Sequence, residues 1–153
     1  MEHILGNCKF LLPMKNQSNR IELEEFKRGI IGLEKVFSEN TDKLTKLDSV
    51  VGDGDHGENM KRGFSSVAGL LRDKSFEDYP DLFQNVGTEL IKSIGGAAGP
   101  IFGSFFLGMK EEVHDKRTIT LTDLANCFAS GLDMVKERGG AEPGDKTMVD
   151  SLE

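Results

Sequence analysis

Three aspartates stand close together in a glycine-rich stretch in the first half of the chain. Residues 48 to 60 read DSVVGDGDHGENM, in which the aspartates are Asp48, Asp53 and Asp55. The glycines allow the backbone to fold so that the three carboxylates converge. Crowded carboxylates repel one another unless a cation neutralises them, and oxygen ligands suit magnesium, calcium or manganese better than zinc. The stretch therefore predicts a divalent metal site at Asp48, Asp53 and Asp55.

A purely structural role for this stretch is the alternative, because aspartate and glycine are also the commonest residues of turns and helix caps. The metal site is favoured because three aspartates occur together and two further polar side chains, His56 and Asn59, adjoin them. A calcium loop of the EF-hand type is excluded by position. Counted from Asp53, Glu58 stands where that loop needs glycine and Phe64 where it needs a bidentate glutamate.

Two other segments are dense in glycine: IGGAAGPIFG at 94–103 and RGGAEPGDKT at 138–147. Each precedes an expected helix start, where free backbone N–H groups and the helix dipole favour phosphate. Glycine pairs in both segments would serve equally well as C-terminal caps of the preceding helices, and that alternative stays open. The second segment is not a P-loop, because Asp145 intrudes before Lys146 and a helix rather than a strand precedes it. Beside a metal loop, these segments predict a site for a metal-bound phosphate ligand, such as a nucleotide.

The composition limits the partners and the compartment of the protein. The chain has 153 residues and a net charge of −7, from 26 acidic and 19 basic residues. One domain is expected, and nucleic-acid binding is disfavoured because it needs many basic contacts. No apolar run approaches membrane-spanning length, so we expect no membrane association. The two cysteines, Cys8 and Cys127, form no metal-type pair and no disulfide framework, which favours a reducing cytoplasm.

Apolar residues recur at steps of three and four along most of the chain, which predicts an all-α fold. With short connections between the helices, an antiparallel up-and-down arrangement is expected. The segment at 100–110 could also be a strand, and a short helix is expected to begin in the final KTMVDSLE. The longer helices are expected at about 20–38, 60–71, 82–90, 100–110 and 120–138.

The three motifs, taken together, carry a family resemblance. LDSVVGDGDHGENMKRGF, SIGGAAGPIFGSFF and RGGAEPGDKTMVDSL resemble, in order and spacing, the ADP- or ATP-binding L subunit of dihydroxyacetone kinases, also found as the C-terminal domain of single-chain kinases. The match runs from about residue 20 to the end. It implies a nucleotide-binding helical barrel over 20–153 and an N-terminal extension without regular structure over 1–19. Family members continue further, so we expect a barrel that is incomplete at the C-terminus and exposes part of its apolar interior.

The resemblance also implies a ligand and its contacts. Asp48, Asp53 and Asp55 would hold two Mg²⁺ ions that bridge to the phosphates of ADP or ATP. Ala98 stands where the family usually has serine, so a hydroxyl contact to phosphate is lost. His56 and Asn59 would contact the nucleotide. The backbone around Ala97 and Ala98 would meet the phosphates, and Gly139 and Met148 would line the adenine side.

The implied activity is transfer of the γ-phosphate to dihydroxyacetone held by a separate K subunit, without a catalytic nucleophile from this chain. A separate L chain favours the phosphoenolpyruvate:phosphotransferase-linked form, in which a phosphohistidine-bearing M subunit rephosphorylates the bound nucleotide. A homodimer is a further expectation. Two alternatives remain: a non-catalytic regulatory module, and a kinase of the related fatty-acid type. The latter more often has threonine after the last aspartate, so His56 favours the dihydroxyacetone branch.

Overall fold

Helices make up most of the described structure, as the all-α prediction requires. The computed structural model describes residues 19–153, so the expected extension at 1–19 lies outside it apart from Asn19. The elements in chain order are β1 (Arg20–Glu22), α1 (Leu23–Glu39), α2 (Thr41–Asp48), α3 (His56–Asp73), α4 (Tyr79–Ser93), α5 (Ala98–Lys110), β2 (Thr118–Thr120), α6 (Leu121–Gly139) and α7 (Val149–Leu152). The strand alternative for 100–110 is wrong, since this segment is helical.

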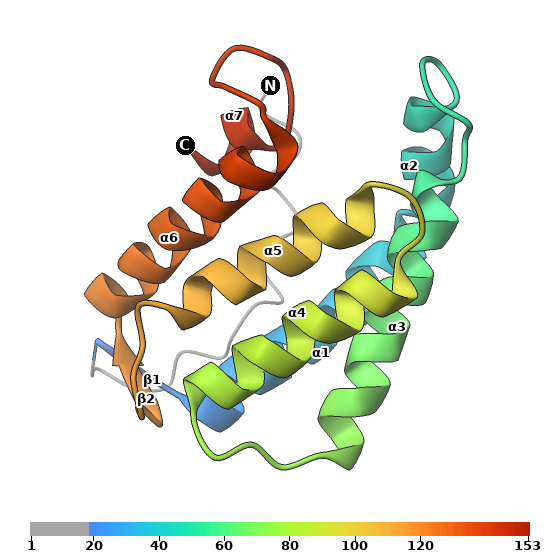
Figure 1. Ribbon diagram of the computed structural model, residues 1–153. Coiled ribbons are helices and arrows are strands. Elements are labelled where there is room, and N and C mark those ends of the chain that lie inside the picture. Colours follow the sequence, from blue (N-terminus) through green and yellow to red (C-terminus); the bar gives the residue numbers. More distant parts are fainter. Residues whose placement is uncertain (1–18) are drawn as a thin grey trace.

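The long helices pack in sequence order (Figure 1). Helix α1 packs on α3, α3 on α4, α4 on α5 and α5 on α6, while α2 packs on α3 and α7 on α6. The strands β1 and β2 connect the start of α1 with the start of α6. The α2–α3 loop and the α6–α7 loop both project at the opposite end, the upper end in Figure 1. This order matches the expected up-and-down arrangement.

Local sequence signals account for where two of the helices begin. The Asp78 carboxylate accepts a hydrogen bond from the Asp81 backbone N–H at 2.9 Å, and Pro80 stands in the first turn of α4. At the start of α6, the Thr120 hydroxyl and the Asp123 carboxylate cap each other's backbone N–H groups at 3.1 and 2.8 Å. This capping box is the one predicted from the sequence.

Two details differ from the sequence prediction. A helix was expected to begin at about residue 20, but residues 20–22 form β1, which pairs antiparallel with β2 in the register Ile21 to Ile119. Three-residue strands are too short to show an alternating pattern, and their partner lies far away in sequence. Helix α2 was not predicted either, because its eight residues contain few apolar side chains.

Close glycine contacts fix α5 between its two neighbours. An added Cβ at Gly103 would lie 2.6 Å from the Gly87 carbonyl oxygen in α4. On the opposite side, a Cβ at Gly108 would lie 2.6 Å from the Ser130 carbonyl oxygen in α6, and one at Gly131 2.8 Å from the Phe105 backbone. Backbones this close leave no space for a side chain, so these glycines set the separation of the three helices.

The hydrophobic core contains several aromatic side chains and a cysteine. Tyr79 is fully buried, and its hydroxyl donates a 3.0 Å hydrogen bond to the Ile21 carbonyl oxygen. Phe26 meets the ring of Phe83 edge-on at 5.5 Å between centroids. Cys127 is also buried, and burial raises the pKa of its thiol to about 11. The thiol therefore stays protonated and acts as a small apolar core group; Cys8 lies outside the described residues.

An apolar groove follows one side of α6. Leu121 and Phe128 are 49% and 43% exposed, which is high for large apolar side chains. Along 19–153, no helix has both the length and the apolar character needed to cross a membrane. The groove is lined by Leu121, Leu124, Ala125, Phe128, Ala129, Leu132, Leu152 and Glu153. An exposed apolar surface was expected from the sequence, and the groove agrees with that expectation.

Candidate metal and nucleotide site

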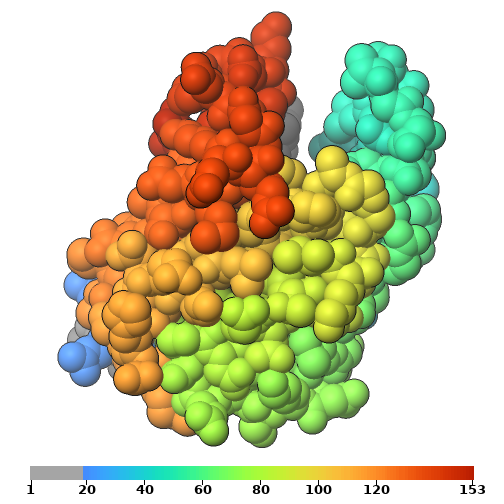
Figure 2. Space-filling model, viewed as in Figure 1, coloured from blue at the N-terminus to red at the C-terminus, as the bar shows by residue number. Residues whose placement is uncertain are grey.

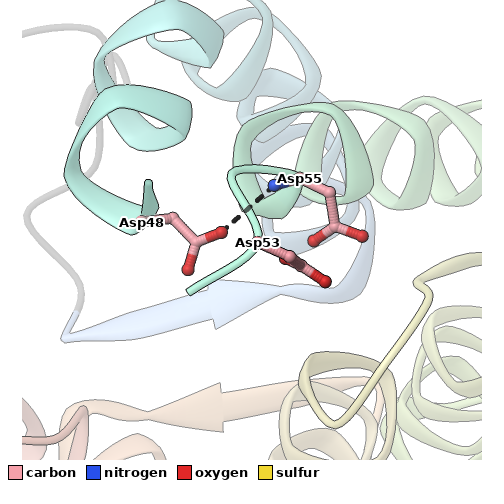
Figure 3. A group of neighbouring side chains, drawn as sticks. All are labelled: Asp48, Asp53 and Asp55. Atoms are coloured by element: carbon pink, nitrogen blue, oxygen red, sulfur yellow. Dashed lines mark hydrogen bonds between the residues drawn. The ribbon is translucent and has the colours of Figure 1, made fainter. Parts of the chain in front are cut away.

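Asp48 organises the aspartate loop that joins α2 to α3. As the last residue of α2, it reaches across the loop, and its Oδ2 accepts hydrogen bonds from three backbone N–H groups, of which Figure 3 shows the one from Asp55. The N···O distances are 2.8 Å from Gly54, 3.1 Å from Asp55 and 3.4 Å from His56. Asp48 thereby caps the start of α3, where Asp55 is the N-cap residue but its side chain makes no cap bond.

Glycine is required at two positions of this loop. Gly54 has a φ of +75°, in the left-handed region that side chains disfavour. A Cβ at Gly52 would lie 2.2 Å from the Asp48 Oδ1, so any side chain there would displace the carboxylate. The glycines predicted to let the aspartates converge therefore do so at these two positions.

The three predicted metal ligands do converge. Asp48, Asp53 and Asp55 each offer a carboxylate oxygen, and these oxygens all lie within 4.8 Å of one another. Figure 3 shows the Asp53 and Asp55 carboxylates side by side, with the Asp48 carboxylate across the loop backbone from them. Asp48 is half-buried, while Asp53 and Asp55 are exposed. An all-oxygen donor set open to water on one side suits Mg²⁺, which retains several water ligands.

Asn59 connects the aspartate loop with the first glycine segment. It lies one turn into α3, is only 7% exposed, and accepts a 2.5 Å hydrogen bond at Oδ1 from the Arg62 Nη2. A Cβ added at Gly95 would lie 3.1 Å from this Oδ1. The two motifs, 35 residues or more apart in the sequence, are thus in contact. His56, the first residue of α3, is half-buried beside them.

The first glycine segment forms the connection between α4 and α5. Gly96 has a φ of +64°, and Ala97 is the N-cap of α5 without a side-chain hydrogen bond. Ala97 is exposed, Ala98 is half-buried, and the first turn of α5 contains no acidic residue. Backbone N–H groups at this helix start lack a side-chain cap, which is the arrangement that favours an anion.

The second glycine segment connects α6 to α7 and lies on α5. Gly140 ends α6 in a left-handed conformation, with a φ of +65°, as the cap alternative predicted. A Cβ at Gly139 would lie 3.2 Å from the Ile101 Cδ1, which places Gly139 over the first turns of α5. Met148 is half-buried against the core at the start of α7.

A hollow separates the aspartate loop from the second glycine segment. Figure 2 shows the two segments as projections on either side of it, with the start of α5 at its base. The structure thus brings the aspartates, Asn59 and the first glycine segment together, and leaves Gly139 and Met148 on the far side of the hollow. A ligand that touches both sides must span it.

Comparison with known proteins identifies the family. A family model described as the DAK2 domain matches residues 50–153. The chain belongs to the DAK2 domain family. The resemblance found in the sequence is thereby confirmed.

Relatives of this DAK2 domain include ADP-binding subunits of dihydroxyacetone kinases. The chain is 44% identical over 115 residues to the PEP-dependent dihydroxyacetone kinase, ADP-binding subunit DhaL, of Escherichia coli K12, covering 75% of the chain and 55% of that protein. It is 40% identical to the PTS-dependent dihydroxyacetone kinase, ADP-binding subunit DhaL, of Lactococcus lactis, covering 74% and 57%. The chain therefore spans about half the length of these curated relatives.

A solved structure supports the fold of the DAK2 domain. The dihydroxyacetone kinase of C. freundii in complex with AMP-PNP and Mg²⁺ is 30% identical, with a TM-score of 0.67. The superposition covers 83% of this chain and 23% of that kinase. The all-α prediction is therefore confirmed both by the helices themselves and by this similarity.

Two residues that shape the candidate site were not predicted from the sequence. Asp150 accepts hydrogen bonds from the backbone N–H groups of Gly144 at 2.6 Å and Thr147 at 2.9 Å, which lower the pKa of its carboxyl. Its spacing in Thr147-x-x-Asp150, typical of a capping box, was the available signal. The second is Arg62, whose contacts with Asn59 and the α4 terminus no local pattern indicates.

Proposed function

We propose that this DAK2 domain binds ADP or ATP with Mg²⁺ and presents the γ-phosphate to dihydroxyacetone held by a separate K subunit. One observation carries the proposal: the first turn of α3, which directly follows the carboxylate cluster, lies close to the glycine segment before α5, since a Cβ added at Gly95 would lie 3.1 Å from the Asn59 Oδ1. A metal loop and a backbone anion site side by side are what a nucleotide's phosphates need. The similarity to ADP-binding subunits supports the same ligand.

In this proposal each side of the phosphate site has a distinct task. Asp48, Asp53 and Asp55 would hold the metal, with two Mg²⁺ ions as the expected number, and bound Mg²⁺ would supply positive charge against the phosphate oxygens. The backbone N–H groups after Ala97 would donate to those oxygens. Because Ala98 carries no hydroxyl, this contact is left to the backbone alone. Phosphoryl transfer then depends on position and charge, and no side chain of this chain serves as a nucleophile.

The remaining contacts would orient the nucleotide across the hollow. His56 and Asn59 stand on the phosphate side, at the start of α3. Gly139 and Met148 stand on the other side, and we propose that they line the adenine. Gly139 is exposed and lies on Ile101, so an approaching base would meet backbone rather than a side chain.

The partners follow from the same proposal. A phosphoenolpyruvate-dependent form would keep its nucleotide bound and receive phosphate from a phosphohistidine-bearing M subunit, after each transfer to the K-bound sugar. The cytoplasm, where phosphoenolpyruvate is formed, is the corresponding compartment. A homodimer is also proposed, because the groove along α6 would be covered by association.

A calorimetric ADP titration tests the nucleotide site. The parent protein should bind ADP with Mg²⁺ and lose binding when EDTA replaces the metal. Asp53→Ala should weaken binding by roughly tenfold or more, because a metal ligand is lost. Asp73→Ala is the matched control, since Asp73 is an exposed aspartate at the other end of α3. Binding that is indifferent to EDTA and to Asp53→Ala would contradict the proposal.

A regulatory module without kinase activity is the second candidate function. The observation in its favour is the exposed apolar groove along α6, because surfaces of this kind commonly mark protein contacts. A coupled assay with a K subunit and dihydroxyacetone, run once with ATP and once with a phosphoenolpyruvate-driven M subunit as the phosphate source, separates the two functions. Turnover supports the kinase subunit, whereas complex formation without turnover supports the module.

A further inference from the structure

Arg62 bridges the two loops that form the proposed phosphate site. Its Nε donates a 2.9 Å hydrogen bond to the Ser93 carbonyl oxygen at the end of α4. Its Nη2 donates to the Asn59 Oδ1 at 2.5 Å, and a Cβ at Gly95 would lie 3.3 Å from the same Nη2. One guanidinium therefore hydrogen-bonds the first turn of α3 and the end of α4, and lies close to Gly95 in the glycine segment.

The Arg62 contact also decides which end of the Asn59 amide is available to a ligand. With Oδ1 engaged by the guanidinium, the remaining polar atom of the side chain is the donor Nδ2. Within the described part of the chain, Nδ2 has no hydrogen-bond partner, and it is not among the polar atoms sealed from solvent. A side chain that is 7% exposed and carries a free N–H₂ group is prepared for an acceptor such as a phosphate oxygen.

We propose that Arg62 is a positioning residue: it ties the glycine segment at 94–98 to the aspartate loop and holds the Asn59 amide with its N–H₂ group free for a phosphate. This inference rests on the proposed function for the identity of the ligand, and on the geometry alone for the connection between the loops. Arg62 acts through Asn59 and the glycine segment. The planar fork of arginine is needed because two acceptors on different helices must be met at once.

Hydrogen exchange of the free protein tests the connection without any nucleotide. Arg62→Ala should speed exchange of the backbone amides at 94–98, because the segment loses its hold on α3. Arg72→Ala is the matched control: Arg72 is an arginine on the same helix, paired with Glu34 across to α1. Faster exchange in Arg62→Ala but not in Arg72→Ala supports the proposal. Unchanged exchange at 94–98 in Arg62→Ala overturns it.

Titration with Mg²⁺ and ADP tests whether Arg62 acts through Asn59. Arg62→Ala and Asn59→Ala should each weaken binding by about tenfold, the effect of one charge-assisted hydrogen bond. The double variant should be no weaker than Asn59→Ala, because the two residues serve one contact. Arg62→Lys should restore only part of the affinity, since lysine keeps the charge but cannot reproduce the fork.

Full recovery in Arg62→Lys, or additive losses in the double variant, would overturn the proposal in favour of simple charge attraction. Failure of the parent protein to bind Mg²⁺ and ADP would overturn the proposed function and, with it, the phosphate-directed role of Arg62. The exchange experiment would still decide on the connection between the loops. Thermal melts of all variants show whether any loss reflects unfolding.

Discussion

The Asp48 carboxylate carries two tasks with its two oxygens. Oδ2 accepts from the backbone N–H groups of three successive residues and so builds the loop. Oδ1 lies close to Gly52 and accepts no hydrogen bond within the described chain, so it is the oxygen proposed to bind a metal. Asp53 and Asp55 have no such structural task among the hydrogen bonds of the described chain. Of the three proposed ligands, Asp48 is therefore also part of the fold, whereas the only task proposed for Asp53 and Asp55 is to bind the cation.

This division predicts different stability effects for two aspartates in the absence of metal. Asp48→Ala should lower the free energy of unfolding by about 1–2 kcal/mol, the usual effect of losing a helix cap. Asp53→Ala should leave it unchanged or raise it slightly, because a repelling charge is removed. Urea unfolding in EDTA measures both. Equal destabilisation by the two substitutions would contradict the structural role of Asp48.

Helix α5 is the element on which the site depends. Its start forms the base of the hollow, and its two sides pack against α4 and α6 at backbone distance through glycines. The position of the proposed anion site is thus set by the glycines between α5 and its two neighbours as much as by the glycine segment itself. A substitution at one of these glycines, remote from the hollow, should therefore weaken phosphate binding.

Gly103→Ala tests this dependence. The added methyl group would approach the Gly87 carbonyl oxygen at 2.6 Å, so α4 and α5 must separate. We expect a loss of about 1–3 kcal/mol in the free energy of unfolding, together with weaker ADP binding. Gly69→Ala in α3 is the control, because nothing lies within 4 Å of the added atom and alanine favours helix. The control should be neutral or stabilising; equal behaviour of the two variants would contradict the argument.

The start of α6 should show a pH-dependent stability. The Lys116 ammonium at 2.6 Å, followed by the hydrogen bonds from Thr120, lowers the pKa of Asp123 to about 2. A carboxyl with a lowered pKa in the folded state stabilises the protein above its unfolded pKa of about 4 and loses that contribution as pH falls toward 2. Asp123→Asn should therefore cost stability at neutral pH, with the difference from the parent protein shrinking between about pH 4 and pH 2. Urea unfolding at a series of pH values measures it, and a constant difference would contradict the prediction.

At the scale of the whole molecule, the apolar groove along α6 is the surface least expected of a self-contained monomer. Leu121 and Phe128 expose much of their area there, whereas most large apolar residues of the described chain are buried. Within the groove, the Phe128 ring meets the ring of Phe105 in α5 edge-on, at 5.2 Å between centroids. None of the residues that line the groove is a proposed nucleotide contact, so polar changes there should leave nucleotide binding intact.

Polar substitution in the groove tests its role in association. Leu121→Gln combined with Phe128→Gln should lower the binding of the dye ANS and any self-association seen by ultracentrifugation. Val51→Gln is the control: Val51 is 93% exposed and stands beside the exposed Val50 in the aspartate loop rather than on α6. Its dye binding should match that of the parent protein. Undiminished dye binding in the double variant would show that the apolar surface lies elsewhere.

Local patterns in the sequence were enough for the longer helices and for the acidic cluster. The three-and-four spacing of apolar residues predicted the long helices, and Thr120 with Asp123 predicted where α6 begins. The acidic side chains of the aspartate loop predicted a cluster, because glycines such as Gly52 and Gly54 let the loop close around Asp48. These features depend on residues that are neighbours in the sequence, so short segments of the sequence are enough to predict them.

Only the tertiary structure decided which motifs meet. The contact of Asn59 with Gly95, the bridge made by Arg62, and the pairing of β1 with β2 join residues that are far apart in the chain. The close packing of α5 between α4 and α6 likewise depends on glycines that come to face one another only in the folded protein. Such contacts depend on the packing of whole helices against one another, and no single segment of the sequence carries that information.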